Sequence, residues 1–203
     1  MIRIIDYKIG NVMSIHNMFK KLGLESKVTS DLKEIREAKK LILPGVGAFD
    51  YAMSELNKNH QLKSLICKKV LEDRVPILGI CLGMQLLLDS SEEGKLGGFG
   101  FIKGTVKKIS TNNKTLKVPH MGWNNIKINI KSKLTDGLNN ESKFYFVHSY
   151  AVHCNNSRNV LCTTNHGGEF DSVINHQNIY GTQFHPEKSH KFGLKLLQNF
   201  SKV

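Results

Sequence analysis

Cys81 stands between two glycines at the point where an apolar run gives way to a helix-like one. The segment GICLGMQ covers 79–85 and overlaps the apolar run VPILGI. Gly79 and Gly83 flank Cys81 at the spacing of a nucleophile elbow, with sulfur in place of the usual hydroxyl. Side chains there would crowd a sharp strand-to-helix turn, which forces its central residue into a strained conformation. The spacing therefore predicts a nucleophilic thiol, with a buried core cysteine as the plain alternative.

Two backbone segments are suited to stabilise the oxyanion that such a nucleophile creates. A helix N-terminus after Cys81 favours thiolate over thiol and leaves the amide of Leu82 free to donate. In PGVGAF, at 44–49, the glycines on either side of Val46 allow a backbone amide to approach a reacting carbonyl. We expect Leu82 and Val46 to supply the two oxyanion donors, although P-G-x-G alone also fits an ordinary turn.

A thiolate needs a base and a group that orients the base, and GTQFHPEKS at 181–189 offers both. His185 and Glu187 lie two residues apart at the end of a strand-like run, so their side chains point to the same side. Pro186 between them stiffens the pair. His148, in FVHSY, is the main rival base, but no carboxylate lies near it in sequence. Cys81, His185 and Glu187 together predict acyl transfer through a thioester.

Composition describes an ordinary globular chain. Its 203 residues, 40% of them hydrophobic, predict one domain over 1–203. The N-terminus lacks the long apolar stretch of a signal peptide or membrane span, which favours a cytoplasmic protein. The four cysteines form no C-x-x-C pair, and no cofactor is implied. A group of His153, Cys154, Cys162 and His166 matches no familiar finger spacing, so we expect no metal.

The formal charge of +12 is carried almost entirely by lysine, with only four arginines. Nucleic-acid contacts favour arginine, so this composition argues against a nucleic-acid partner. From Lys103 to Lys133 there are eight lysines and no acidic residue. This lysine-rich segment is either a solvated face or a surface that meets an acidic partner or a phosphorylated substrate.

The first ninety residues alternate short apolar runs with helical stretches. IRIID, ESKVTS, LILPG and VPILGI each precede a helix-like segment, which predicts an open, mostly parallel sheet with helices on both faces. The strand ends then bring Asp6, PGVGAF and Cys81 to one edge, where such sheets bind ligands. From Gly100 onward the segments are strand-like until the closing helix in KSHKFGLKLLQNF. These additional strands either extend the sheet or form a flanking antiparallel one.

GICLGMQ, PGVGAF and GTQFHPEKS resemble the class I glutamine amidotransferases, which have a flavodoxin-like α/β fold. DYKIGNVMS at 6–14, SSEEG at 90–94, KVPHMGWN at 117–124 and YFVHSY at 145–150 resemble, within that family, the glutaminase subunits of imidazole glycerol phosphate synthase. The resemblance covers essentially the whole chain. It implies Cys81 as nucleophile, His185 as base and then acid, and Glu187 as orienter. It also implies a site for substrate glutamine at Gly47, Gln85, Glu93, Ser149 and Tyr150.

The same resemblance implies a protein partner. Pro119, Met121 and Trp123 fall where the family faces a (β/α)₈-barrel synthase subunit in a heterodimer. That subunit takes up the ammonia and makes imidazole glycerol phosphate and an aminoimidazole carboxamide ribotide in histidine biosynthesis. No membrane is involved in this scheme.

Three other functions stay open. Lys8 stands where the family usually has glycine, and Ala151 where another aromatic residue is common; both leave the acceptor of the ammonia undecided. An alternative acceptor is a sugar-amidinating enzyme of surface-polysaccharide biosynthesis. A non-catalytic regulatory module has no need of Cys81, His185 and Glu187 together. A stand-alone γ-glutamyl hydrolase has little use for the Trp and Met surface of PHMGW.

Overall fold

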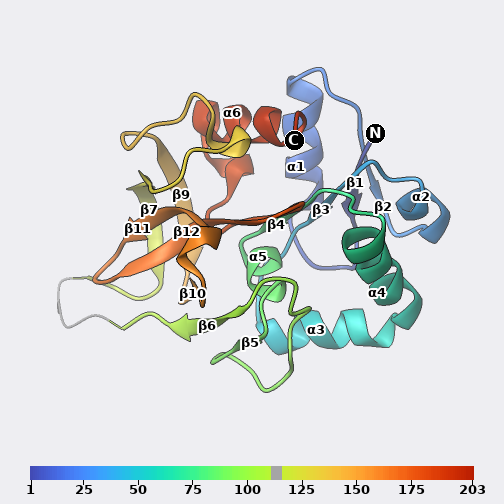
Figure 1. Ribbon diagram of the computed structural model, residues 1–203, viewed down its shortest axis with the longest axis horizontal. Helices are drawn as coiled ribbons and strands as arrows, with labels where there is room; N and C mark the ends of the chain where they lie inside the picture. Colours follow the sequence, from blue (N-terminus) through green and yellow to red (C-terminus); the bar gives the residue numbers. More distant parts are fainter. Residues whose placement is uncertain (111–115) are drawn as a thin grey trace.

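The computed structural model describes residues 1–110 and 116–203, and Figure 1 shows their arrangement in three layers. A mixed sheet of 11 strands, in the order β2-β1-β3-β4-β13-β12-β10-β6-β5 with β11 and β8 attached through β12, lies between two layers of helices. Lys114, one of the eight lysines of the lysine-rich segment, lies outside the described residues. No helix within the described ranges is both long and apolar enough to cross a membrane.

Five adjacent strands form the main parallel part of the sheet. They are β1 (Ile2–Ile5), β2 (Ser26–Thr29), β3 (Lys40–Leu43), β4 (Ile77–Ile80) and β13 (Ile179–Thr182). The first four are the apolar runs that alternate with helices in the sequence, and each pairs in parallel with its neighbour. β13 joins them from the far end of the chain by pairing in parallel with β4. The predicted parallel sheet is confirmed.

Helices cover both faces of these strands. On one face lie α1 (Val12–Lys21) and α6 (His190–Phe200), which contact each other; on the other lie α2 (Leu32–Arg36), α3 (Phe49–Lys58), α4 (His60–Cys67) and α5 (Leu82–Leu86). α4 continues into a π-helical turn at Lys68–Glu72.

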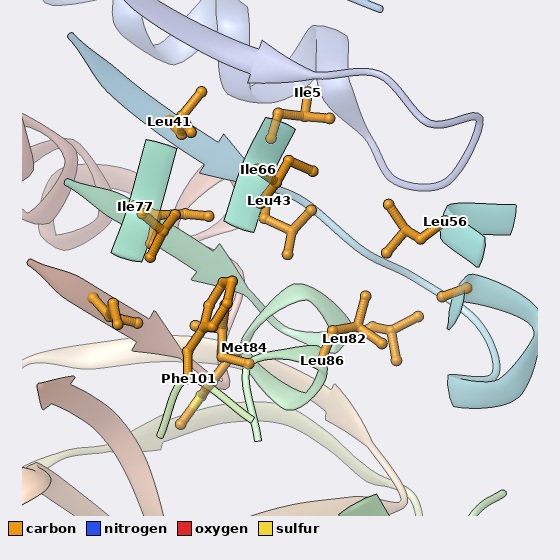
Figure 2. Close-up of a cluster of buried hydrophobic side chains, with 14 of the residues drawn as sticks. Ile5, Leu41, Leu43, Leu56, Ile66, Ile77, Leu82, Met84, Leu86 and Phe101 are labelled. Carbon is orange, nitrogen blue, oxygen red and sulfur yellow. The ribbon is translucent and has the colours of Figure 1, made fainter. Parts of the chain in front are cut away.

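Two apolar cores result because successive side chains of a strand point to opposite faces. In β1 and β3, Ile4 and Ile42 pack with the core under α1 and α6. Their neighbours Ile5 and Leu43 pack with the core under the other helices, where α5 contributes Leu82 (Figure 2). α5 is thus anchored to the sheet by its apolar side chains.

The second half of the chain both extends the sheet and adds a separate ribbon. Antiparallel pairing continues the sheet from β13 through β12 (Glu169–His176) to β10 (Tyr150–Cys154) and β6 (Gly104–Lys108). β11 (Val160–Asn165) pairs with β12 and with the short strand β8 (Lys127–Ile128), and the short strand β5 (Ser90–Ser91) pairs in parallel with β6. The ribbon consists of β7 (His120–Asn125) and β9 (Lys143–His148). Both arrangements left open by the sequence therefore occur.

β12 is the one long strand that the sequence did not predict. Its segment EFDSVINH carries charged and polar residues that break a clear alternation. Val173 and Ile174 are nevertheless fully buried, because β12 lies between β10 and β13 inside the sheet. Asp171 is satisfied there by the backbone N–H of Cys154, which donates to its carboxylate at 2.7 Å. Neighbouring strands, rather than local preference, account for this element.

We propose that residues 1–203 form a single domain, because one sheet runs through both halves of the chain. Unfolding in urea is then expected to be one cooperative transition. Far-UV circular dichroism reports the helices, whereas fluorescence of Trp123, the only tryptophan, reports the β7–β9 ribbon. Coincident midpoints from the two probes are the expected result. Two separated midpoints would show that the ribbon half unfolds on its own.

Candidate active site

The backbone at Cys81 has the strain that the glycine spacing predicts. Cys81 has φ 54° and ψ −111°, a region that residues with a side chain rarely adopt, and it lies directly before α5. A Cβ on Gly83 would lie 1.9 Å from the carbonyl oxygen of Leu43, and one on Gly79 would lie 2.6 Å from the carbonyl oxygen of Gly83. Glycine is therefore required on both sides so that the turn can pack against β3.

His185 and Glu187 form a buried pair behind the elbow. Nδ1 of His185 donates to Oε1 of Glu187 at 2.7 Å, and both side chains are 2% exposed. Burial opposes a charge on His185, but its interactions with Cys81 and Glu187 outweigh burial and raise its pKa to about 10. Nε2 of His185 has no hydrogen-bond partner among the described residues, and His185 lines the same cavity as Cys81. This arrangement is suited to proton exchange with a thiolate and its substrate.

His148, the rival base, has no nitrogen left for a thiol. Its Nδ1 donates to the carbonyl oxygen of Tyr150 at 2.8 Å, so Nε2 of the neutral ring is the acceptor. That acceptor meets Nδ1 of His120 at 3.0 Å, and Nε2 of His120 in turn accepts from Asn124 at 3.2 Å. The carbonyl oxygen of Tyr150 can only accept, so it fixes the proton on Nδ1 of His148 and, through it, the proton on Nδ1 of His120. His148 and His120 are therefore neutral structural groups that link β7 to the cavity.

The cavity beside Cys81 has a volume of about 520 Å³. The cavity is lined by both expected oxyanion donors and by all the residues expected to hold substrate. The donors are Val46 and Leu82, and the substrate residues are Gly47, Gln85, Glu93, Ser149 and Tyr150. Pro119 lines the same cavity. These residues come from five separate parts of the chain. Oε2 of Glu93 accepts the N–H of Phe49 at 2.9 Å, at the start of α3, which leaves the other carboxylate oxygen for a ligand.

The PGVGAF loop packs tightly at one end and is open at the other. A Cβ on Gly45 would lie 2.6 Å from the amide nitrogen of Gly83, so Gly45 holds the loop against the elbow. Gly47 has φ 99° and open space around it, and Val46 is 45% exposed.

Lys8 adopts φ 69°, the left-handed region that glycine favours, with its N–H bonded to Oδ1 of Asp6 at 3.0 Å. Lysine thus occupies, with backbone strain, a position where the family usually has glycine.

Met121 and Trp123 lie outside the cavity, on the exposed side of β7. Met121 is 64% exposed and Trp123 is 48% exposed. The Trp123 ring stacks on His190 at the start of α6, with ring centroids 5.2 Å apart. Pro119, by contrast, lines the cavity. The three residues expected to face a partner therefore run from the cavity rim to the outer surface.

Two polar residues near the sulfur were missed by sequence reasoning. Nε2 of Gln183 lies 3.9 Å from Sγ of Cys81, and the hydroxyl of Tyr7 donates to the carbonyl oxygen of Pro44 at 2.6 Å. Burial and the nearby charge of Cys81 raise the pKa of Tyr7. Their positions in the sequence could have indicated them, because Gln183 directly follows β13 and Tyr7 follows Asp6 after β1, at the same edge of the sheet as Cys81.

The other cysteines differ from Cys81 in their surroundings. Burial raises the pKa of Cys67, and it raises that of Cys162 to about 12; burial together with Asp171 raises that of Cys154. Across residues 1–110 and 116–203, no three His, Cys, Asp or Glu side chains converge as metal ligands. His153, Cys154, Cys162 and His166 are thus not brought together as a metal-binding group.

A family model, described as "Glutamine amidotransferase class-I", matches residues 3–203. The chain belongs to the class I glutamine amidotransferases. This membership confirms the predicted family and enzyme class.

Curated relatives match over their full length. The chain is 54% identical to "Imidazole glycerol phosphate synthase subunit HisH 2" of Methanococcus maripaludis, covering 100% of this chain and 99% of the relative. It is 47% identical to the HisH subunit of Sulfurimonas denitrificans, with 100% and 98% covered. It is 43% identical to that of Bdellovibrio bacteriovorus, with both chains fully covered.

Solved structures agree on the fold. The structure of PurLQS from Thermotoga maritima superposes with a TM-score of 0.73 at 18% identity, covering 99% of this chain and 97% of that one. A putative GMP synthase protein from Thermoplasma acidophilum superposes with a TM-score of 0.72 at 22% identity, covering 98% and 90%. The predicted α/β fold class is confirmed.

The neutral histidines predict a pH dependence of stability. Burial, as the main cause, lowers the pKa of His120 to about 3 and that of His148 to about 4. In the unfolded chain both histidines bind a proton below about pH 6.5, whereas in the folded chain the buried rings stay neutral. The two neutral rings therefore contribute their full share to the free energy of unfolding above about pH 6.5, and this share declines toward about pH 4. The free energy of unfolding in urea is therefore expected to be lower at pH 5 than at pH 7. The ring ¹H shifts of both histidines should stay constant over that interval, and a titration of either ring above about pH 5.5 would contradict the assignment.

Proposed function

We propose that this chain is the glutaminase subunit of an imidazole glycerol phosphate synthase and supplies that enzyme with ammonia from glutamine. The full-length likeness to HisH subunits, at up to 54% identity, carries the proposal. It is supported by the convergence of Cys81 and His185 on one cavity, with Glu187 bonded to the histidine.

In this proposal the Cys81 thiolate attacks the side-chain amide carbon of glutamine. The carbonyl oxygen becomes an oxyanion, which the N–H of Leu82 and an amide near Val46 stabilise. His185, as the imidazolium, gives its proton to the leaving nitrogen, and ammonia departs while a thioester remains on Cys81. The neutral His185 then takes a proton from water, which hydrolyses the thioester to glutamate and restores the thiolate. Glutamine and water are thereby converted to glutamate and ammonia.

The raised pKa of His185 suits the first half of this reaction. An imidazole with a pKa of about 10 is protonated at neutral pH, so a proton donor stands ready when the C–N bond breaks. Glu187 stabilises that charge and fixes the ring through Nδ1. Its second oxygen, Oε2, is buried without a hydrogen-bond partner in the described structure, so His185 is the group that pairs with the carboxylate.

The remaining cavity residues are proposed to hold the amino-acid end of glutamine. The carboxylate of Glu93 is suited to an α-ammonium group, whereas Gly47, Ser149 and Tyr150 offer backbone and hydroxyl groups. Gln85 directs its amide nitrogen to the carbonyl oxygen of Tyr150 at 3.0 Å and keeps its own oxygen for a ligand N–H. This division of donors and acceptors matches a zwitterionic substrate.

The proposed partner is a (β/α)₈-barrel synthase subunit that binds over β7. Exposed Met121 and Trp123 provide an apolar anchor, and Pro119 connects that surface with the cavity where ammonia is released. The lysine-rich segment around β7 is expected to border an acidic face of the barrel. A sugar-amidinating enzyme as acceptor remains the competing outcome, and coupled turnover with each partner distinguishes the two.

The first test replaces Cys81 with serine. Glutamine hydrolysis is expected to fall by several orders of magnitude, because the hydroxyl is a far weaker nucleophile than the thiolate. Synthase turnover by the complex, supplied with an ammonium salt instead of glutamine, should be unchanged. An electrophilic glutamine analogue should label Cys81 and spare Cys67, Cys154 and Cys162. Labelling of one of those three instead would rule out the assigned nucleophile.

The second test concerns activation by the partner. We expect the isolated chain to hydrolyse glutamine slowly, and the barrel subunit with bound acceptor to accelerate it about 10²–10³-fold, the effect of one oxyanion donor. The peptide planes around Val46 can turn because Gly47 is unhindered, whereas Gly45 is packed against the elbow.

Gly47→Val is therefore the informative substitution, since it strains a residue at φ 99° without a clash. It should abolish the activation and leave alkylation of Cys81 by iodoacetamide intact, because that reagent does not use the glutamine site. Gly168→Val is the matched control, because its surroundings are also open and its φ is not positive; it should be activated normally. Full hydrolysis by the isolated wild-type chain would instead indicate a stand-alone hydrolase.

A further inference from the structure

Gln183 is buried directly behind the nucleophile. It follows the last residue of β13 and is fully buried, with its backbone N–H donating to the carbonyl oxygen of Ser172 at 2.9 Å. Its side-chain nitrogen Nε2 lies within hydrogen-bonding distance of Sγ of Cys81, at 3.9 Å. A buried amide donor therefore meets the reacting sulfur from the side of the sheet.

The orientation of this amide is fixed by its neighbours. Nε2 of Gln85 donates to Oε1 of Gln183 at 3.1 Å and to the carbonyl oxygen of Tyr150 at 3.0 Å. That carbonyl also accepts from Nδ1 of His148. If the Gln183 amide were turned over, two NH₂ groups would face each other and its oxygen would point at the sulfur. The carbonyl oxygen of Tyr150, which can only accept, thus orients Gln85, and Gln85 in turn directs the NH₂ of Gln183 toward Cys81.

Other polar side chains around the sulfur have different tasks. The Tyr7 hydroxyl donates to Pro44, and both nitrogens of His148 are already bonded. His185 is needed for proton transfer, and Glu187 bonds to it. Glu93 and Lys188, the charged residues at the cavity wall, come from other elements. Gln183 is the neutral side-chain donor that contacts Sγ within the described structure.

We propose that Gln183 is a further catalytic residue, which donates an N–H to Sγ of Cys81 and stabilises the thiolate before attack and after release of the product. The proposal rests on Cys81 being the nucleophile of the proposed function. A neutral donor can stabilise the anion throughout the cycle, whereas His185 gives up its proton part-way through it. A hydrogen bond to a charged acceptor is also stronger than one to a neutral acceptor, so Gln183 favours thiolate over thiol and over thioester sulfur.

The test measures the rate at which iodoacetamide alkylates Cys81, followed by mass spectrometry of its peptide between pH 5 and 10. Gln183→Met keeps the length of the side chain but removes the donor. The pH midpoint of the rate is expected to rise by about one to two units, with the rate below the wild-type midpoint about tenfold to hundredfold lower. That midpoint belongs to Cys81 and His185 as a coupled pair, so the comparison is made between variants.

Ser172→Ala is the matched control. Ser172 is fully buried beside Gln183, and its hydroxyl has no hydrogen-bond partner in the part of the chain described, so its removal disturbs packing but no donor to sulfur. Its alkylation profile should coincide with that of the wild type. An equal shift in Ser172→Ala and Gln183→Met would assign the effect to packing and overturn the proposal.

Gln183→Leu provides a second variant, which removes the donor without adding a charge or a new donor at the sulfur. It should also raise the midpoint, because the thiolate loses the N–H of Gln183. An unchanged profile in whichever of the two variants folds would overturn the role of Gln183. Because alkylation is read at Cys81 itself, this outcome is independent of whether Cys81 attacks glutamine, which the electrophilic analogue reports separately.

Discussion

The close packing of the elbow backbone on β3 is the constraint on which the rest of the site depends. The carbonyl oxygen of Leu43 lies where a Cβ on Gly83 would be, and Gly45 and Gly79 are similarly close to the elbow. Only with this contact can α5 begin directly after β4 and leave Cys81 at φ 54°. Such strain persists only where the surrounding structure over-determines it. Here the apolar side of α5, with Leu82, Met84 and Leu86 in the core, holds the turn in place (Figure 2).

The electrostatics of the site follow from burial around this turn. A buried carboxylate is costly unless it is paired, and Glu187 is paired with His185 inside the same short segment. Burial alone would favour the neutral ring, but the interactions with Cys81 and with Glu187 raise the pKa of His185 and favour its charged form. At His148 the outcome is opposite, because its partners are a carbonyl and another neutral histidine. Two histidines near one cavity thus hold different protonation states, because His185 interacts with Cys81 and Glu187, whereas His148 is buried without an acidic partner among the described residues.

The antiparallel half of the molecule completes the cavity from the other side. β9 and β10 bring Ser149 and Tyr150 opposite the elbow, and the N–H of His185 bonds to the carbonyl oxygen of Tyr145 at 2.9 Å. β12 joins β13 to β10 and thereby sets the distance between the two halves. β9 also pairs with β7, and this β7–β9 ribbon presents Met121 and Trp123 outward. One wall of the cavity, with Val147 and His148, and the exposed apolar surface therefore lie on the same β7–β9 ribbon.

The sequence by itself determined the local features of this protein. Glycines around Cys81 indicated the elbow because steric crowding depends on the residues at that turn, and the alternation of apolar runs indicated the parallel sheet because period and burial are linked. The spacing of His185 and Glu187 likewise predicted a pair. Tertiary structure decided the rest. β12 is a strand because of its neighbours, His148 is neutral because of His120, and Gln183 faces Cys81 because Gln85 orients it. The contacts of His148 and Gln183 join residues 28 or more positions apart, and local patterns carry no information about which distant partner a polar group will meet.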